Sequence, residues 1–210
     1  MPIIDLSHKI TAELPLYPGT PDIEVRGIKT VEKDGYAEGK LSFTSHIGTH
    51  LDAPAHMIKE GATLDSFSIE RFVGTALVIS TDNTPLIESE AIIQAIDLYG
   101  KPDWIILRTG WSQKWGTAEY FCDFPILSPS ATEQLIKLKI SGIAIDASSF
   151  DPVNGSSFYN HLHLLGAEIL LGENFTNLGH LPTNQLISLS VLPLFWDNAD
   201  GAPARAVAQW

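Results

Sequence analysis

Three histidines and one aspartate lie within eleven residues of this sequence, at His46, His50, Asp52 and His56, and the chain has seven histidines in all. The four positions have the same parity, so an extended backbone directs their side chains to one face. A straight strand would nevertheless hold His46 and Asp52 roughly 20 Å apart. Bonds to a shared zinc ion are about 2.0–2.2 Å long, so shared coordination requires the chain to curl at Gly48. One such histidine alone is an ordinary turn residue, but the combined imidazole and carboxylate groups predict a site for Zn²⁺ or Mn²⁺.

A metal ion used in catalysis is usually held by ligands from more than one segment, and a second group of candidates lies far along the chain. His161 is expected near the start of a short helix, and Glu173 at the far end of the strand that follows it. A helix followed by a strand returns the chain to roughly where it began, so the two side chains can meet. Taken singly, such a histidine is ordinarily a core residue and such a glutamate a solvated charge. Their combination favours the second half of a metal site.

The elements that must position these residues alternate in type along the chain. Apolar runs such as 74–80 are typical of buried strands, and residues 88–98 carry apolar side chains at helical spacing. Ser130 and Glu133 form a capping-box pattern that predicts the start of a further helix. The predicted strands are 3–6, 23–31, 41–43, 74–80, 104–107, 142–146, 169–171, 188–196 and 204–208, with a turn at 33–35, and the predicted helices are 88–98, 130–139 and 159–166. Two β-rich ends around a βαβαβ middle predict a single α/β domain over residues 1–210 with a mixed sheet.

Composition narrows the class of protein. With 13 Lys and Arg residues and 25 Asp and Glu residues the net charge is −12, which disfavours nucleic acid and anionic membranes as partners. No run approaches eighteen consecutive apolar residues, so no membrane span is predicted, and the N-terminus lacks a signal-peptide pattern. The single cysteine, Cys122, excludes an intramolecular disulfide and fits a reducing compartment. Its aromatic neighbours predict a buried, unreactive side chain. These features predict a soluble cytoplasmic protein.

The central cluster resembles a known family signature. The run His46-x-Gly48-Thr49-His50-x-Asp52-x-Pro54-x-His56 is similar to the H-x-G-T-H-x-D-x-P-x-H motif of the metal-dependent cyclase-like hydrolases, which include bacterial kynurenine formamidases and isatin hydrolases. The resemblance covers nearly the whole chain. Its other segments are Asp5-Leu6-Ser7, Tyr17-Pro18-Gly19, Arg108-Thr109-Gly110, His161-x-x-Leu164-Leu165, Glu173-Asn174, Leu192-Pro193-Leu194 and Ala202-Pro203-Ala204-Arg205-Ala206-Val207.

This resemblance implies a ligand set, a fold and an assembly. It implies that His46, His50 and Asp52 bind one ion, and that in members with two ions Asp52 bridges to a second ion completed by His161 and Glu173. The implied cofactor is therefore one or two divalent ions per chain, Zn or Mn. The implied fold is of the swivelling β/β/α type. The implied assembly is a homodimer or higher homo-oligomer, with the active site near the subunit contact.

The same resemblance gives His56 an acid or base role in catalysis and leaves His163 outside the motif. Kynurenine formamidases usually have Trp-Pro-Gly-Asp in the loop where this chain has Tyr17-Pro18-Gly19-Thr20. Tyr17 and Pro18 are the expected substrate-binding residues. Four further aromatic residues lie in segments that could line the same pocket, namely Trp111, Phe150, Phe158 and Tyr159. A flat aromatic substrate is therefore expected.

These observations favour metal-assisted hydrolysis of a small aryl amide, first of all an arylformamidase that converts N-formylkynurenine to kynurenine and formate. Hydrolysis of an isatin-type cyclic amide or of a lactone is the alternative within the family. A non-catalytic metal-binding protein is the alternative of another class, and it would have no need of His56 or of an aromatic pocket. A serine hydrolase is disfavoured because the sequence has no Gly-x-Ser-x-Gly motif, and a zincin because it has no His-Glu-x-x-His.

Overall fold

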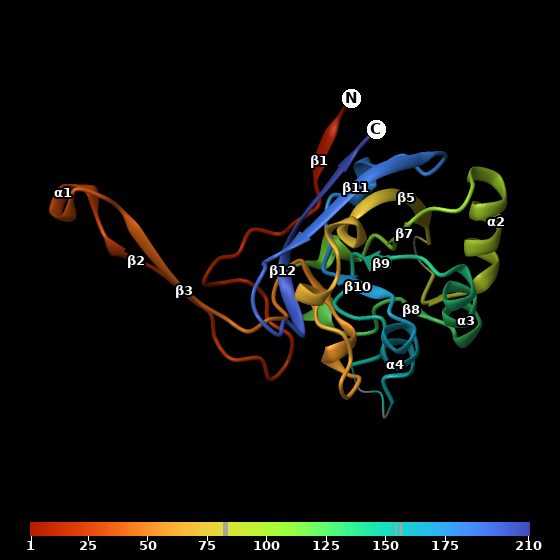
Figure 1. Cartoon of the computed structure of the whole chain (residues 1–210), viewed down its shortest axis with the longest axis horizontal. Coiled ribbons are helices and arrows are strands. Elements are labelled where there is room, and N and C mark those ends of the chain that lie inside the picture. The colour runs from red at the N-terminus through yellow and green to blue at the C-terminus, as the bar shows by residue number, and fades with distance from the viewer. Residues whose placement is uncertain (82–83, 154, 156) are drawn as a thin grey trace.

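The computed structural model describes residues 1–81, 84–153, 155 and 157–210. Within these ranges a single mixed sheet of eight strands forms the centre of the molecule (Figure 1). Its strands are β1 (Ile3–Asp5), β4 (His50–Asp52), β5 (Val73–Ser80), β7 (Trp104–Arg108), β9 (Gly142–Ile145), β10 (Leu170–Glu173), β11 (Leu186–Pro193) and β12 (Gly201–Gln209). The spatial order is β1-β12-β11-β5-β7-β9-β10-β4, and β4 also pairs with β12. That extra pairing closes the sheet into a barrel-like arrangement, and the predicted α/β fold with a mixed sheet is confirmed.

The parallel part of the sheet is covered by helices on its outer face. Strands β5, β7, β9 and β10 run parallel to one another. The helices α2 (Ser89–Tyr99), α3 (Pro129–Leu138) and α4 (Tyr159–Gly166) lie on one side of them (Figure 1). Because both faces are buried in the middle of these strands, their central residues are apolar, as in 76–79, 104–107 and 142–145. Successive residues alternate between two cores: Ala76 and Val78 pack inside the barrel, whereas Leu77 and Ile79 pack against the helices.

The start of α3 differs from the capping-box prediction. The N-cap is Ser128, whose side chain accepts a hydrogen bond from the backbone N–H of Ala131 at 3.2 Å, and Pro129 occupies the first helical turn. Proline is favoured there because its missing N–H has no partner in the first turn of a helix. Ser130 instead donates to Glu88 at 3.0 Å, so the prediction that Ser130 and Glu133 form the cap is wrong by two residues.

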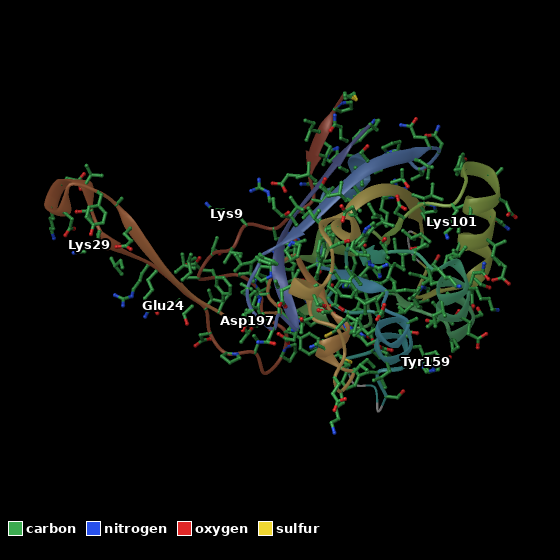
Figure 2. All side chains as sticks on the ribbon, in the orientation of Figure 1. Lys9, Glu24, Lys29, Lys101, Tyr159 and Asp197 are labelled. Carbon is green, nitrogen blue, oxygen red and sulfur yellow. The ribbon has the colours of Figure 1, made fainter. Side chains whose placement is uncertain are left out.

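A two-stranded arm projects from the body of the protein (Figure 1). It consists of β2 (Glu24–Lys29), the short helix α1 (Val31–Asp34) and β3 (Glu38–Ser42). The predicted turn at 33–35 is confirmed, with Gly35 in the left-handed region at φ +80°, but the second strand begins three residues before the predicted 41–43. No residue of β2, α1 or β3 is buried, and Figure 2 shows Lys29 on the outer part of the arm, beyond Glu24.

The remaining elements are short. They are the paired strands β6 (Leu86–Ile87) and β8 (Ile126–Leu127) and the 3₁₀ helices η1 (Pro54–His56), η2 (Leu64–Ser66), η3 (Ile69–Phe72), η4 (Trp111–Lys114), η5 (Ala118–Phe121) and η6 (Leu178–His180). Of the helices that the described ranges contain, none has the length and apolar character needed to cross a bilayer. Cys122, directly after η5, is exposed. The prediction of a buried cysteine is wrong, because Cys122 and Asp123 face solvent between the buried Tyr120 and Phe124.

Candidate metal centre and active site

The chain curls at Gly48, as the spacing of the histidines requires. Gly48 has φ +54°, a left-handed conformation that side-chain-bearing residues adopt at a cost. His46 precedes the curl, His50 and Asp52 lie on the same face of β4, and His56 ends the helix η1. Only His50 and Asp52 lie on a strand, so the four side chains do not share one extended face, in agreement with the predicted curl. The curl brings His46 back to Asp52, with Nδ1 and Oδ1 2.6 Å apart.

The second segment meets the first through strand pairing. Strands β4 and β10 are antiparallel neighbours, and their register places Glu173 directly opposite His50. His161 lies in the first turn of α4, and its Nε2 is 3.1 Å from Glu173 Oε1. His163 instead is exposed and hydrogen-bonds the carbonyl of Tyr159 at 2.7 Å. The structure thus brings together all five residues expected to hold metal, and leaves His163 outside the group.

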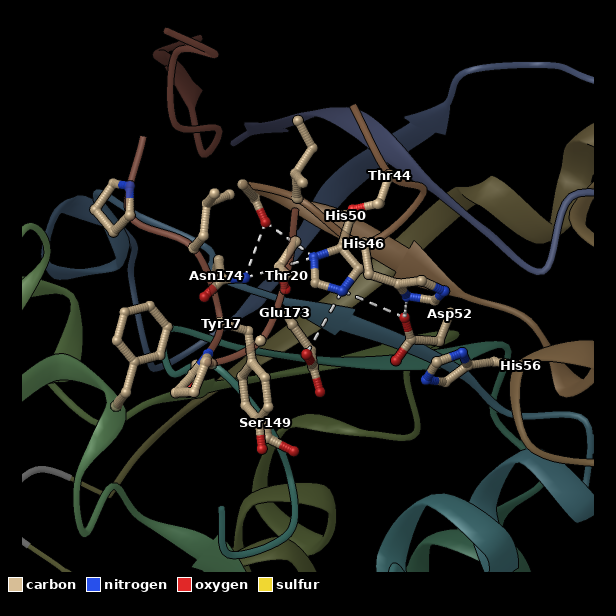
Figure 3. A pocket seen from close by; sticks show the side chains of 18 of the residues that line it. Tyr17, Thr20, Thr44, His46, His50, Asp52, His56, Ser149, Glu173 and Asn174 are labelled. Carbon is tan, nitrogen blue, oxygen red and sulfur yellow. Dashed lines mark hydrogen bonds and ion pairs between the residues drawn. The ribbon is translucent and has the colours of Figure 1, made fainter. Parts of the chain in front are cut away.

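The donor atoms gather around Asp52, which lies beside His46 and His50 in Figure 3. Its Oδ1 lies 2.6 Å from His46 Nδ1 and 3.3 Å from His50 Nε2, and its Oδ2 lies 3.6 Å from His161 Nε2. Donors around an ion with bonds of 2.0–2.2 Å are roughly 3.0–3.5 Å apart. The His50 separation matches this range and the His161 separation is close to it, whereas His46 lies at hydrogen-bonding distance and would move back to admit an ion. His50 Nε2 also lies 3.5 Å from Glu173 Oε2. Two groups of three residues offer donor atoms that all lie within 4.8 Å of one another, one of His46, Asp52 and His56 and one of His50, Asp52 and Glu173, so both groups contain Asp52.

Each of the three histidines offers one nitrogen to this centre and has the other nitrogen fixed by an oxygen acceptor. The fixed pairs are His46 Nε2 with Asp200 Oδ2 at 2.9 Å, His50 Nδ1 with the Gly48 carbonyl at 2.9 Å, and His161 Nδ1 with Asp151 Oδ2 at 2.7 Å. An acceptor on the outer nitrogen keeps the proton there and leaves the inner lone pair free for a metal. The geometry is therefore that of a prepared ligand set.

Asp151 is one functional residue that the sequence did not reveal. Its Oδ1 accepts from the backbone N–H of Asn160 at 2.9 Å and its Oδ2 from that of His161 at 2.9 Å. It therefore caps α4 and orients the His161 ring with the same carboxylate. Although burial opposes ionisation, the hydrogen bonds from His161 and Asn160 lower the pKa of Asp151. An aspartate shortly before a helix start was the only available sequence signal.

The electrostatics of the centre favour a bound cation. Burial and the neighbouring charge of Asp52 raise the pKa of Glu173, because two carboxylates in one buried site repel each other. Burial lowers the pKa of His46, but the carboxylates of Asp52 and Asp200 outweigh it and raise the value to about 9. Buried carboxylates need a counter-charge. A divalent ion between them would supply it and displace the proton of His46.

A cavity of about 540 Å³ opens onto these residues, within the usual size range for small-ligand sites. Tyr17 and Pro18 line it as predicted, and His56 lies at its edge near His46 (Figure 3). Tyr17 forms an edge-to-face pair with Phe121, with ring centroids 6.2 Å apart. Phe121 also lines the cavity and was not anticipated, because its place depends on how η5 folds against the loop of Tyr17.

The other predicted aromatic residues have different positions. Phe158 lines the cavity. Phe150 is fully buried behind His161, and Trp111 donates its ring N–H to the carbonyl of Tyr120 at 2.8 Å while lining a separate cavity. Tyr159 packs against His163 on the outside of α4, with centroids 4.0 Å apart. The expectation that Trp111, Phe150 and Tyr159 line the pocket is wrong, since each packs elsewhere.

Several known proteins are similar to this chain in sequence or in structure. The family model Cyclase matches residues 4–152. The chain belongs to the cyclase family. A kynurenine formamidase from Geobacillus thermodenitrificans is 31% identical over 98% of this chain and 96% of its own length, and one from Bacillus anthracis is 30% identical over 97% and 95%. Isatin hydrolase A from Labrenzia aggregata, solved with benzyl benzoate, superposes with a TM-score of 0.87 at 26% identity, covering 99% of this chain and 93% of that one. The predicted family and the predicted amidohydrolase class are confirmed by these relatives.

Proposed function

We propose that this cyclase-family protein hydrolyses a small aromatic amide, with an aryl formamide such as N-formylkynurenine as the first candidate. The observation that carries the proposal is the position of the prepared ligand set at the base of a cavity lined by Tyr17 and Phe121. The relatives from Geobacillus thermodenitrificans and Bacillus anthracis, both kynurenine formamidases, support the same reaction. The products would be an arylamine and formate.

The proposed cofactor is Zn or Mn. One ion would be held by His46, His50 and Asp52, and a second by Asp52, His161 and Glu173, a proposal supported by the position of the Asp52 carboxylate beside His46, His50 and His161. A divalent ion bound in this way supplies Lewis acidity, which polarises a carbonyl and lowers the pKa of water. Imidazole and carboxylate donors suit both metals.

His56 is proposed to carry the proton of the reaction. Its side chain is 29% exposed, and its ring centroid lies 3.9 Å from that of His46 and 6.4 Å from that of His161. Burial lowers the pKa of His56, so its imidazole is neutral at pH 7 and can accept a proton from water. The same nitrogen can then return the proton to the departing aryl nitrogen. His56 also lies within 4.8 Å of donors of His46 and Asp52, so ligation is the role against which its acid–base role must be tested.

Tyr17 and Phe121 are proposed to hold the aryl ring of the substrate. The edge-to-face pair presents the edge of one ring and the face of the other, and aromatic contacts of this kind contribute about 0.5–1.5 kcal/mol beyond area burial. Isatin also carries a carbonyl next to an aryl nitrogen, and the similarity to isatin hydrolase A makes an isatin-type cyclic amide the second candidate substrate. A metal-binding protein without catalysis would not need His56 at the edge of an aromatic cavity.

The proposed assembly is a homodimer formed through the projecting arm. The arm exposes apolar side chains, with Leu41 59% and Val31 62% exposed, and such a ribbon gains stability by packing against another surface. Residues 24–42 carry four basic and four acidic side chains, so their net charge is zero, and the rest of the chain carries 9 − 21 = −12. An arm with zero net charge, charges of both signs and exposed apolar side chains is complementary to a second copy of itself. The other, strongly acidic surfaces repel each other.

The arm proposal is tested by sedimentation equilibrium of the purified protein. Val25 and Leu41 are cross-strand partners, so the double variant Val25→Asp/Leu41→Asp is expected to be monomeric. Leu98→Asp is the matched control, because Leu98 is 72% exposed on α2, away from the arm. A double variant that keeps the mass of the wild-type assembly would refute the proposed interface.

The proposed reaction is tested with a substrate panel. The purified protein, loaded with Zn²⁺ or Mn²⁺, is offered N-formylkynurenine, formanilide, isatin, an aliphatic formamide and an aryl lactone, and product release is followed spectroscopically. We expect the aryl formamides to be hydrolysed faster than the aliphatic one. Equal rates on aryl and alkyl formamides, or activity confined to lactones, would exclude the arylformamidase proposal.

A further inference from the structure

Asp200 lies beside the candidate metal centre although it is far from the other site residues in the sequence. It immediately precedes β12, and β12 pairs with β4 in a register that places Gly201 opposite Asp52. The carbonyl of Asp200 accepts a hydrogen bond from the backbone N–H of Ala53 at 2.9 Å. Backbone pairing to the metal-binding strand therefore fixes Asp200, and its position does not depend on a free loop.

One oxygen of Asp200 contacts three side chains at the centre. Its Oδ2 lies 2.9 Å from His46 Nε2, 3.4 Å from Ser45 Oγ and 3.8 Å from His56 Nδ1. The carboxylate is 38% exposed, so water can solvate it and its charge is not costly to maintain. A solvated carboxylate against the outer nitrogen of a buried imidazole is the arrangement that orients a histidine ligand.

Gly201 packs against the ring of His46. A Cβ atom at position 201 would overlap the ring of His46, so only glycine lets the imidazole lie against this strand. The ring is thus held by the backbone of Gly201 on one side and by the carboxylate of Asp200 at Nε2. Its Nδ1 then points to Asp52 Oδ1, 2.6 Å away.

We infer that Asp200 is a positioning residue, which fixes the tautomer and rotation of His46. Because an ionised carboxylate can only accept, Asp200 keeps a proton on Nε2, so an ion that displaces the proton between Nδ1 and Asp52 would meet the Nδ1 lone pair. Without Asp200 the ring could rotate or adopt the other tautomer, and its lone pair would then miss the ion. This inference rests on the proposed role of His46 as a metal ligand.

The test compares Asp200→Ala and Asp200→Asn with Asp197→Asn in the same loop. Asp197 hydrogen-bonds only its neighbour Asn198, at 2.7 Å, among the contacts of the described residues, so it is a matched control. Zinc affinity is measured by competition with a chromophoric chelator, and the Co²⁺-loaded proteins are compared by their visible absorption. Loss of an acceptor that orients a histidine ligand typically weakens metal binding about 10- to 100-fold.

We expect Asp200→Ala to bind zinc 10- to 100-fold more weakly and to change the Co²⁺ spectrum. Asp200→Asn should retain part of the affinity, because its amide oxygen can still accept from Nε2, and Asp197→Asn should match the wild type. Circular dichroism and urea unfolding of the metal-free variants show whether they are folded. If Asp200→Ala does not fold, Asp200→Asn with an altered Co²⁺ spectrum supports the inference and an unaltered spectrum overturns it.

The proposed function and the role of Asp200 fail in different ways. Wild-type affinity and spectrum in both Asp200 variants would overturn the role of Asp200, even if aryl formamides are hydrolysed. A wild-type protein that binds zinc but hydrolyses nothing in the substrate panel would overturn the proposed reaction. The affinity comparison remains decisive in that case, since it does not depend on turnover.

Discussion

His56→Gln is expected to remove most of the turnover while leaving the metal in place. Replacing His56 leaves three proposed donor atoms in place. Asp52 Oδ1 still lies 2.6 Å from His46 Nδ1 and 3.3 Å from His50 Nε2. General acid–base catalysis by a histidine contributes about 10²–10⁴ in rate, which equals about 2.7–5.4 kcal/mol of transition-state stabilisation. Glutamine keeps a similar volume and a hydrogen-bonding end group, so the cavity should not collapse.

The assay is kcat on an aryl formamide, measured together with the metal content of the same preparation. His163→Gln is the matched control, because this histidine is exposed on α4 and contacts only the Tyr159 carbonyl and ring in the part of the chain that the structure describes. The control is expected to keep both activity and metal. If the metal content of His56→Gln falls in proportion to its activity, His56 is a ligand and the reasoning is refuted.

Three further predictions concern the pocket, the pH dependence and the curl. Tyr17→Ala should lower kcat/KM for aryl formamides roughly two- to thirteen-fold, which corresponds to 0.5–1.5 kcal/mol. Its metal content should be unchanged, and an equal loss on aliphatic formamides would contradict the ring contact. Metal must displace the proton of His46, whose pKa is about 9, so zinc affinity measured by titration should rise up to about tenfold per pH unit below pH 9; a pH-independent affinity would contradict this. Gly48→Ala should lower the unfolding free energy by about 1–2 kcal/mol, because position 48 has a positive φ, and an unchanged urea midpoint would contradict it.

The first half of the site was predictable because its spacing is local. His46, Gly48, His50 and Asp52 lie in one short run, and a shared ion forces the curl at the only glycine between them. Glu173 was predictable less directly, from the return of the chain through a helix and a strand. The pairing of β4 with β10 then places it opposite His50.

The residues that support the ligands could not be predicted from spacing. Asp200 reaches the site because β12 pairs with β4, and strand pairing between such distant segments leaves no periodic signal in the sequence. Phe121 lines the pocket because η5 packs against the loop of Tyr17. The prediction of a helix cap at Ser130 was wrong for a different reason. The proline directly after Ser128 was the stronger signal for the start of the helix. The exposed Cys122 shows that aromatic neighbours in sequence do not imply burial.

The measurement that tests the central claim most directly is the metal content of the wild type and of Asp52→Asn, each assayed on the same aryl formamide. Asp52 lies beside His46 and His161, one from each proposed ion site, so its replacement should disrupt both sites. We predict one or two Zn or Mn ions per chain in the active wild type, and loss of metal and activity together in Asp52→Asn. A wild type that remains fully active after its metal has been stripped, or an Asp52→Asn variant with full metal content, would contradict the account.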